Sequence, residues 1–198
     1  MSTTTRFTTA RLTARLWEHT DAERAYDMYS RWEVARWLGA TPRALESPAE
    51  APAVIDRWRR RSADPRYGIW ALERRDTGVV AGSVMLLPLP LPDEDGSGNG
   101  GSGGNGGSGN GGGEIEVGWH LHPDSWGHGY ATEAARAALA KGFADGLTEI
   151  HAVVRPGNDR SAAVCRRLGM TPQGRSTRWY GVELDTFRIT RPTGSPNM

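Results

Sequence analysis

The residues best suited to chemistry lie in one short stretch, residues 126–134, which read WGHGYATEA. The stretch follows a strand-like pattern and opens a helical one, and it contains Gly127 and Gly129. At a helix start several main-chain N–H groups lack partners, the dipole end is positive, and glycine lets an anion approach the backbone. We therefore predict a site for a phosphate or pyrophosphate. It is not a Walker loop, because no lysine follows the last glycine, nor the Rossmann pattern, because Thr132 occupies its final position.

A second strand–turn–helix pattern follows in residues 154–161, which read VRPGNDRS. Taken alone, this turn needs no function, because Asn158 or Asp159 would serve as the N-cap of the next helix. The first stretch alone is also compatible with a plain turn and a helix cap. The two patterns in one chain are more informative than either is alone.

Together these residues resemble the Gcn5-related N-acetyltransferase (GNAT) superfamily, and within it the ribosomal-protein N-terminal (RimJ/RimL-type) and aminoglycoside-type acetyltransferases. The superfamily pattern Q/R-x-x-G-x-G/A is met by Gly129 and Ala131, with Trp126 in the first position, a change typical of that branch. Four further segments are similar to the family: Asn158-x-x-Ser161, Leu168-Gly169-Met170, Glu116-Val117-Gly118-Trp119, and the closing strands around Trp179-Tyr180-Gly181 and Asp185-Thr186-Phe187.

The resemblance implies an α/β (α+β) fold with a mixed, largely antiparallel sheet of six to seven strands flanked by helices. It implies that the fourth and fifth strands splay apart near Gly118 and Trp119, and that acetyl-CoA is the cofactor. The pyrophosphate would lie on the amides of residues 127–132, and a main-chain N–H near Trp119 or His120 would polarise the thioester carbonyl. The expected CoA-binding residues are Trp119, His120, Leu121, Trp126, Gly127, His128, Gly129, Tyr130, Ala131, Thr132, Asn158 and Ser161.

The reaction implied is direct attack of a neutral primary amine on the thioester, so a base must take a proton from the amine. Glu116 is the first candidate, because strand alternation places it on the same face as Gly118 and His120. His120 is the second. A solvated strand residue, or an ion pair that orients a neighbour, is the alternative role for Glu116.

The departing thiolate needs a proton or a hydrogen-bond donor. Many members of the superfamily place a tyrosine seven residues after the asparagine of the second motif, and here that position is Cys165. A thiol could donate, but a small buried hydrophobic residue is the other role for Cys165. Ser161 is the second candidate, and a hydroxyl at a helix start is its alternative role.

The rest of the chain predicts the elements that position these residues. Residues 7–17 alternate as one half-buried strand, Thr20 with Glu23 forms a capping-box pattern, and Ser47 with Pro48 opens a second helix. Further strands are predicted over residues 67–73, 79–87, 114–121, 149–155, 170–174 and 178–190, and further helices over residues 131–143 and 161–168.

We interpret residues 1–198 as a single domain interrupted by an insertion at 93–113, with a flexible tail at 191–198. Within the insertion, residues 96–113 hold 12 of the 26 glycines, and the other members are serine and asparagine. Such a composition cannot bury apolar area, so we expect a flexible coil. A linker between two domains is the alternative.

Composition excludes several functional classes. A net charge of +1, from 24 basic and 23 acidic residues, falls short of a nucleic-acid binder. A single cysteine, a polar start and no long apolar run lead us to expect a cytoplasmic protein without membrane contact. His120, His122, Asp124 and His128 do not make a convincing metal site, so no metal is expected.

The function predicted is acetyl transfer from acetyl-CoA to an amine acceptor, either a protein N-terminal α-amine or a small-molecule amine. Trp32 and Trp37 lie where the family builds its acceptor pocket. The alternative is a catalytically weak, CoA-binding regulatory module, because the family tyrosine is missing at position 165. Monomer and homodimer remain equally open.

Overall fold

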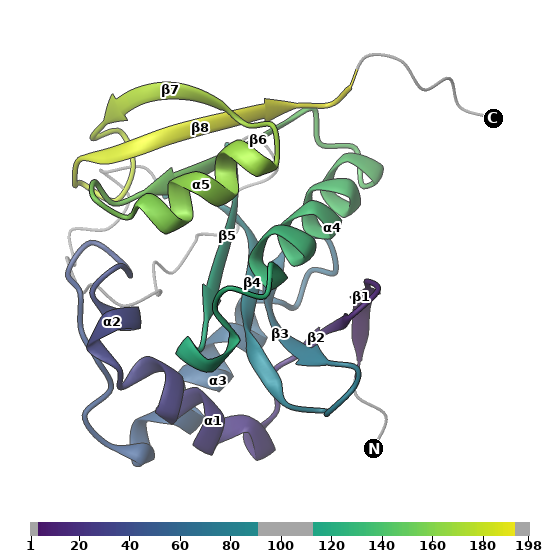
Figure 1. Cartoon of the computed structure of the whole chain (residues 1–198), viewed down its shortest axis with the longest axis vertical. Helices are drawn as coiled ribbons and strands as arrows, with labels where there is room; N and C mark the ends of the chain where they lie inside the picture. Colours follow the sequence, from purple (N-terminus) through teal and green to yellow (C-terminus); the bar gives the residue numbers. More distant parts are fainter. Residues whose placement is uncertain (1–3, 91–112, 193–198) are drawn as a thin grey trace.

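The computed structural model describes residues 4–90 and 113–192, which form one mixed sheet with helices on both faces (Figure 1). The strands are β1 (Thr5–Thr8), β2 (Leu12–Leu16), β3 (Gly68–Arg74), β4 (Val80–Pro88), β5 (Ile115–Leu121), β6 (Glu149–Val154), β7 (Thr171–Ser176) and β8 (Leu184–Thr190). The helices are α1 (Ala22–Tyr29), α2 (Trp32–Ala35), α3 (Ala51–Arg61), α4 (Tyr130–Ala144) and α5 (Asp159–Arg167), with 3-10 turns η1 (His19–Asp21), η2 (Pro48–Glu50) and η3 (Pro123–Ser125).

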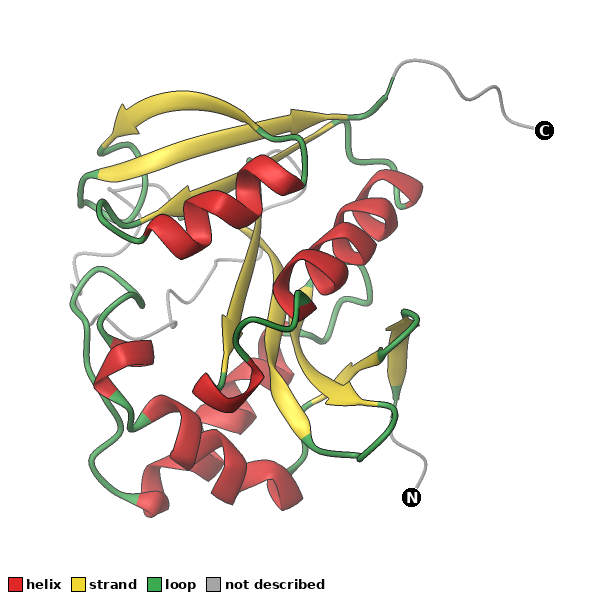
Figure 2. Ribbon diagram, viewed as in Figure 1, coloured by secondary structure: helices red, strands yellow, loops and turns green. Residues whose placement is uncertain are grey.

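The strand order is β1-β2-β3-β4-β5-β6-β8-β7, and every neighbouring pair is antiparallel except β5 and β6. Two apolar layers cover the sheet. Residues of α4 and α5 pack against one face, and residues of α1, α2 and α3 pack against the other (Figure 2). The α/β class and the largely antiparallel sheet predicted from the sequence are confirmed.

The first predicted strand is corrected by the structure. Residues 7–17 were expected as a single strand, but β1 and β2 form a hairpin around a turn in which Thr9 N donates to Leu12 O (2.8 Å). The sheet therefore has eight strands rather than six or seven. Alternation of side chains continues through both arms of a hairpin, so the pattern alone did not reveal the turn.

The predicted capping box at Thr20 and Glu23 is also wrong. The box is formed by Glu18 and Asp21 at η1, where Asp21 accepts from Glu18 N (2.9 Å) and from the Arg15 guanidinium (2.7 and 2.8 Å). A buried ion pair with β2 thus sets the start of α1. The sequence of residues 20–23 does not indicate the ion pair between Arg15 and Asp21.

Two other predictions about helices, the start of α3 and the packing of α4, agree with the structure. Ser47 and Glu50 form the capping box at η2, with Pro48 in the first position, and α3 continues from it. The small-residue face of α4 packs close to the sheet as predicted. A Cβ added at Gly142 would lie 2.9 Å from Ile150 Cδ1, so the contact leaves no room for a side chain there.

Helices long and apolar enough to span a bilayer do not occur in the described part of the chain. The insertion predicted at 93–113 falls almost wholly outside the described residues, as does all of the predicted tail beyond Pro192.

We predict that replacing residues 96–113 with a short turn preserves folding. β4 and β5 pair as far as Pro88 with Ile115, and Leu89 N donates to Glu114 O (2.8 Å), so the described residues on the two sides of the tract already lie side by side. Shortening such a connection changes the free energy of unfolding by about 1 kcal/mol or less. Thermal unfolding followed by circular dichroism checks this. Loss of a single cooperative transition would show that the tract joins separate units.

Candidate active site

The sheet opens between β5 and β6. β5 pairs with β4 along its whole length, but its only pairing with β6 joins Glu116 to His151. Beyond Glu116 the two parallel strands diverge, which confirms the splay predicted between them (Figure 1). Main-chain groups of β5 that face the gap therefore have no strand partner there, and a ligand can bind to them.

The glycine stretch lies at the end of β5 and opens α4. Gly127 (φ 80°) and Gly129 (φ 79°) both adopt the left-handed conformation, and Gly129 is the N-cap of the helix. The first helical bond runs from Glu133 N to Gly129 O. Among the described residues, no acceptor is found for the N–H groups of residues 127–132. The loop thus presents consecutive unpaired donors at a positive helix end, as an anion requires.

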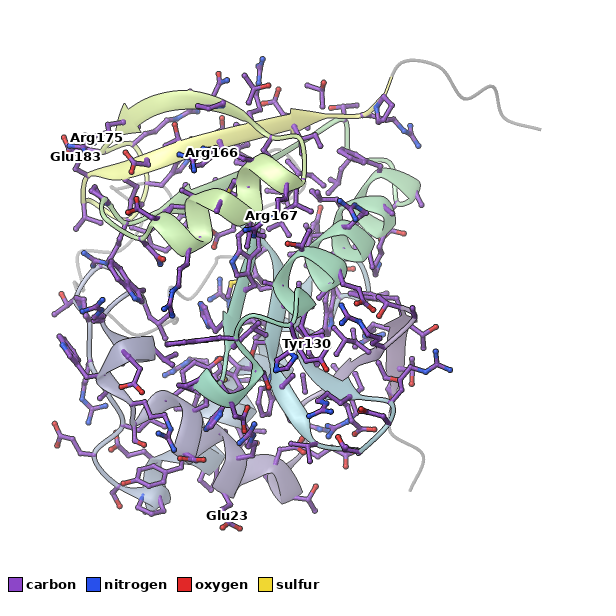
Figure 3. All side chains as sticks on the ribbon, in the orientation of Figure 1. Glu23, Tyr130, Arg166, Arg167, Arg175 and Glu183 are labelled. Atoms are coloured by element: carbon purple, nitrogen blue, oxygen red, sulfur yellow. The ribbon has the colours of Figure 1, made fainter. Side chains whose placement is uncertain are left out.

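The β1–β2 turn holds this loop in place. Arg11 Nη1 donates to His128 O (2.9 Å), and Arg11 Nε donates to Glu133 Oε2 (2.7 Å). Thr9 Oγ1 donates to Glu133 Oε1 (2.6 Å). Tyr130 lies buried at the start of α4 (Figure 3), with the Arg11 guanidinium 4.8 Å from the centre of its ring and His128 stacked on it at 5.5 Å. The β1–β2 hairpin, near the N-terminus, therefore holds the glycine loop in place although Arg11 and His128 are 117 positions apart in the sequence.

Side chains of β5 alternate across the sheet. Trp119 and Leu121 pack against the α4–α5 layer, whereas Glu116 and His120 lie on the opposite face with α1 and α3. The two candidate bases predicted from the sequence are thus on one face, as expected. The two predicted cofactor-binding side chains Trp119 and Leu121 are on the other, so the strand separates them from the candidate bases.

Glu116 is a buried carboxyl group, 6% exposed. Burial raises its pKa, which the hydrogen bond donated by Tyr180 Oη and the charge of Arg61 partly oppose, to about 7. A general base works best when its pKa is close to the pH of the reaction. A large fraction of it is then deprotonated, and its affinity for the proton is still high. Glu116 meets that condition.

His120 does not meet it. Its Nδ1 forms a 3.2 Å hydrogen bond with Tyr29 Oη, which in turn bonds Ser83 Oγ at 2.9 Å. Burial lowers the pKa of His120 to about 4, so the imidazole is neutral at pH 7 and a weak base. Between the two candidates, the electrostatics favour Glu116.

The second turn is a capped helix start. Asn158 Oδ1 accepts from Ser161 N (3.2 Å), so its carbonyl group serves as the N-cap of α5. Ser161 is partly buried in the first turn. Cys165, one turn further, is 0% exposed within the α4–α5 layer, and burial raises the pKa of its thiol to about 12. These surroundings fit the second role considered for Cys165, that of a small hydrophobic residue.

Trp126 bridges the two turns. Its Nε1 donates to Leu121 O (2.9 Å), which ties the glycine loop to the end of β5. The Arg160 guanidinium of α5 lies 4.9 Å from the centre of its ring, a cation–π contact between the start of α5 and the loop before α4.

The histidines considered as metal ligands have other partners. His122 Nε2 lies 3.0 Å from Asp27 Oδ2, and its Nδ1 accepts from Asp124 N (3.2 Å). In the described residues, one group is close enough to hold a metal ion: Glu114, Glu149 and His151. Arg178 and Arg188 donate to its two carboxylates, so the group is already neutralised by cations.

Comparison with known proteins identifies the family. The family described as Acetyltransferase (GNAT) domain matches residues 11–171. The chain belongs to the GNAT acetyltransferases. As a member, it is an acyltransferase that uses acetyl-CoA and binds an amine acceptor.

Individual GNAT relatives are distant. The uncharacterized N-acetyltransferase YoaA of Bacillus subtilis is 27% identical over 190 residues, which cover 93% of this chain and 96% of YoaA. An acetyltransferase from Agrobacterium tumefaciens has a TM-score of 0.70 at 24% identity, covering 96% of each chain. Mycobacterium smegmatis RimJ, solved in complex with CoA-disulfide, has a TM-score of 0.69 at 18% identity and covers 92% of this chain and 86% of RimJ. The two structures show a shared fold.

The geometry fits the cosubstrate of the GNAT family. A diphosphate needs closely spaced donors, which the N–H groups of residues 127–132 provide, and an extended arm needs an open sheet edge, which β5 provides beyond Glu116.

Sequence reasoning missed two partners of the site. Arg11 lies 117 positions before His128, and the arginine- and threonine-rich sequence around it does not indicate the contact. Tyr180 lies in a segment recognised only as a closing strand, although the structure has it in the turn between β7 and β8. Both contacts depend on tertiary structure alone.

We predict that Glu133→Gln destabilises the protein by about 1 kcal/mol at pH 7, a modest value because Arg11 is half exposed. Burial alone would raise the pKa of Glu133, but hydrogen bonds from Thr9 and Arg11 lower it below its ordinary 4.5. The stabilisation is therefore present above about pH 4.5 and is lost on further acidification. Urea unfolding at pH 7 and pH 3 measures it. A difference between wild type and variant that is unchanged at pH 3 would contradict the assignment.

Proposed function

We propose that this acetyltransferase transfers the acetyl group directly from acetyl-CoA to a primary amine, either a protein N-terminal α-amine or a small-molecule amine, with Glu116 as the base. The observation that carries the proposal is the buried Glu116 carboxyl, with a pKa of about 7, on the edge of the gap between β5 and β6. It supports proton removal at the point where the sheet opens.

The CoA diphosphate binds to the amides of residues 127–132, and the pantetheine arm lies along the open edge of β5. Left-handed glycines and the absence of acceptors for these amides in the described residues support this placement. The wider set that surrounds the cosubstrate comprises Trp119, His120, Leu121, Trp126, Gly127, His128, Gly129, Tyr130, Ala131, Thr132, Asn158 and Ser161. A main-chain N–H near Trp119 or His120 donates to the thioester carbonyl.

Protonation of the acceptor is the chief obstacle to the reaction. An α-amine has a pKa of about 8, whereas a lysine-like amine has one of about 10.4 and is almost wholly charged at pH 7. Glu116 accepts the proton, directly or through water, and the amine nitrogen then forms its bond to the carbonyl carbon as the carbon–sulfur bond breaks. A base with a pKa near 7 suits the less basic α-amine.

The departing sulfur is stabilised from the α5 side. We retain the Ser161 hydroxyl as its hydrogen-bond donor, because Ser161 lies in the partly exposed first turn of α5. Cys165 is left out of this role, because a fully buried thiol with a pKa of about 12 is a poorer acid than the thiol it would serve.

An amine panel tests the acceptor class. Thiol release from acetyl-CoA is measured with peptides that have a free or blocked N-terminus and a lysine, and with aminoglycoside-like amines, and the products are identified by mass spectrometry. We expect acetylation of the peptide N-terminus or of a small amine, and no acetylation of the N-terminally blocked peptide. CoA binding without any acetylated product would favour a regulatory module instead.

We predict that Gly129→Ala weakens CoA binding at least tenfold. Alanine costs about 1–2 kcal/mol in the left-handed conformation, so the N–H groups move out of alignment. Gly146→Ala is the matched control, because Gly146 also has positive φ (99°), at the other end of α4, with open space around it. Calorimetry should show similar losses of stability but weaker CoA binding only in Gly129→Ala. Equal CoA affinities would refute the loop assignment.

We predict that Glu116→Gln lowers kcat by about 100- to 10,000-fold without weakening CoA binding. The kcat of the wild type should increase with pH around pH 7, as Glu116 loses its proton. The kcat of the variant should not show this increase. Glu183→Gln is the control, because Glu183, just before β8, is an exposed carboxylate paired with Arg175 of β7 (Figure 3). A Glu116→Gln variant with the wild-type pH profile would remove Glu116 from the reaction.

A further inference from the structure

The turn between β7 and β8, residues 177–183, reaches across β6 to β5. Trp179 is buried, its ring centre lies 5.4 Å from that of His151 on β6, and its Nε1 donates to Glu114 Oε2 (3.2 Å) on the β5 side. Arg178 Nη1 donates to the other oxygen of Glu114 (3.0 Å). Two adjacent residues of the turn thus hold one carboxylate, only two positions before Glu116.

The next residue of the turn completes the contact. Tyr180 Oη donates to Glu116 Oε1, so the turn is bound to Glu114, just before β5, and to Glu116 within β5. Glu116 is also the one residue of β5 paired with β6, which places Tyr180 where the gap between the strands begins.

Tyr180 is held in an unfavourable backbone conformation. Its φ of 59° is the only positive value at a described residue other than glycine, and Gly181 follows with φ 62°. Two consecutive left-handed residues are typical of type I′ turns, which favour asparagine and glycine and penalise side chains such as tyrosine. A tyrosine with this backbone conformation lowers the stability of the fold. The hydrogen bond from its hydroxyl group to Glu116 explains why a tyrosine is nevertheless present.

We propose that Tyr180 is a positioning residue for acetyl transfer, which holds the Glu116 carboxylate in one orientation at the mouth of the β5–β6 gap through its phenolic hydroxyl. The inference rests on the proposed role of Glu116 as base and adds the group that orients it. Of the two carboxylate oxygens of Glu116, Oε1 accepts the hydrogen bond from Tyr180 Oη. Oε2 is then the oxygen that takes the proton from the amine.

The charge state of both partners supports this role. Burial and the Glu116 charge raise the pKa of Tyr180 well above its ordinary value, so the phenol stays protonated and remains a donor. Its hydrogen bond in turn favours the ionised form of Glu116. The titratable and charged groups on the elements next to the pair are Arg61 from α3, Glu114 just before β5, His120 from β5, Glu149 and His151 from β6, Arg178 from the turn and Arg188 from β8.

Tyr180→Phe and Tyr180→Asn test the proposal together. Phenylalanine keeps the ring and the backbone penalty, whereas asparagine relieves the penalty, and both remove the phenol. We expect the rise of kcat with pH to move upward by about one unit in both variants, because Glu116 loses a donor that stabilises its charge. CoA affinity should stay at the wild-type value, and Tyr180→Asn should be at least as thermally stable as Tyr180→Phe.

A purely structural role would give a different pattern. It would lower the rate equally at every pH and in proportion to the loss of thermal stability, with Tyr180→Asn the more active variant. If kcat of Tyr180→Phe rises at the same pH as kcat of the wild type, the proposal is wrong.

Carbon-13 NMR of glutamate carboxyl groups provides the second readout, without acceptor or CoA. The Glu116 signal is assigned by its loss in Glu116→Gln, and its titration should move to higher pH in Tyr180→Phe. If Glu116→Gln proves fully active, the proposed base is wrong even when this NMR shift is present. If Glu116→Gln is inactive and the Glu116 titration is the same in Tyr180→Phe as in wild type, the base stands and the role of Tyr180 is wrong.

Discussion

The separation of β5 from β6 is the constraint on which the rest of the structure depends. Two parallel strands that pair at a single position leave main-chain groups without partners inside the sheet, which is costly unless a ligand or water satisfies them. β4 pairs with β5 along its whole length, so β5 keeps one strand neighbour although its other neighbour has diverged. The gap therefore offers an extended ligand a strand edge to bind.

Three distant parts of the chain converge on this gap. The N-terminal hairpin fixes the glycine loop through Arg11 and Glu133, and the C-terminal β7–β8 turn contacts β5 through Tyr180. The middle of the chain supplies the strand itself. The proposed anion binding and proton removal thus depend on tertiary contacts between parts of the chain that lie far apart in the sequence.

Much of this arrangement could be predicted from the sequence, for identifiable reasons. The order and type of the elements follow from alternation, from the Ser47–Glu50 capping box and from the small residues of α4, all of which are local signals. Glu116 and His120 fall on one face because strand alternation has a fixed period. Their different pKa values could not be predicted, since they depend on burial beneath helices from elsewhere in the chain.

The errors share a physical cause. The start of α1 is set by the buried Arg15–Asp21 pair, and the split of residues 7–17 into two strands is set by a turn whose Thr9 also contacts α4. Cys165 was considered as a donor because of its spacing from Asn158, and that role stays an untested prediction; spacing along a helix does not indicate that the thiol is buried in the apolar layer. In each case a long-range contact outweighs the local pattern.

Amide NMR during a CoA titration tests most directly whether the glycine loop and the open edge of β5 form one binding surface. Glycine amides give well-separated signals, and Gly127, Gly129 and Gly118 sample the loop and the strand. We expect all three signals to shift together with a single dissociation constant, while Gly146 at the far end of α4 stays in place. Saturable shifts that leave Gly127, Gly129 and Gly118 unmoved would show that CoA binds elsewhere.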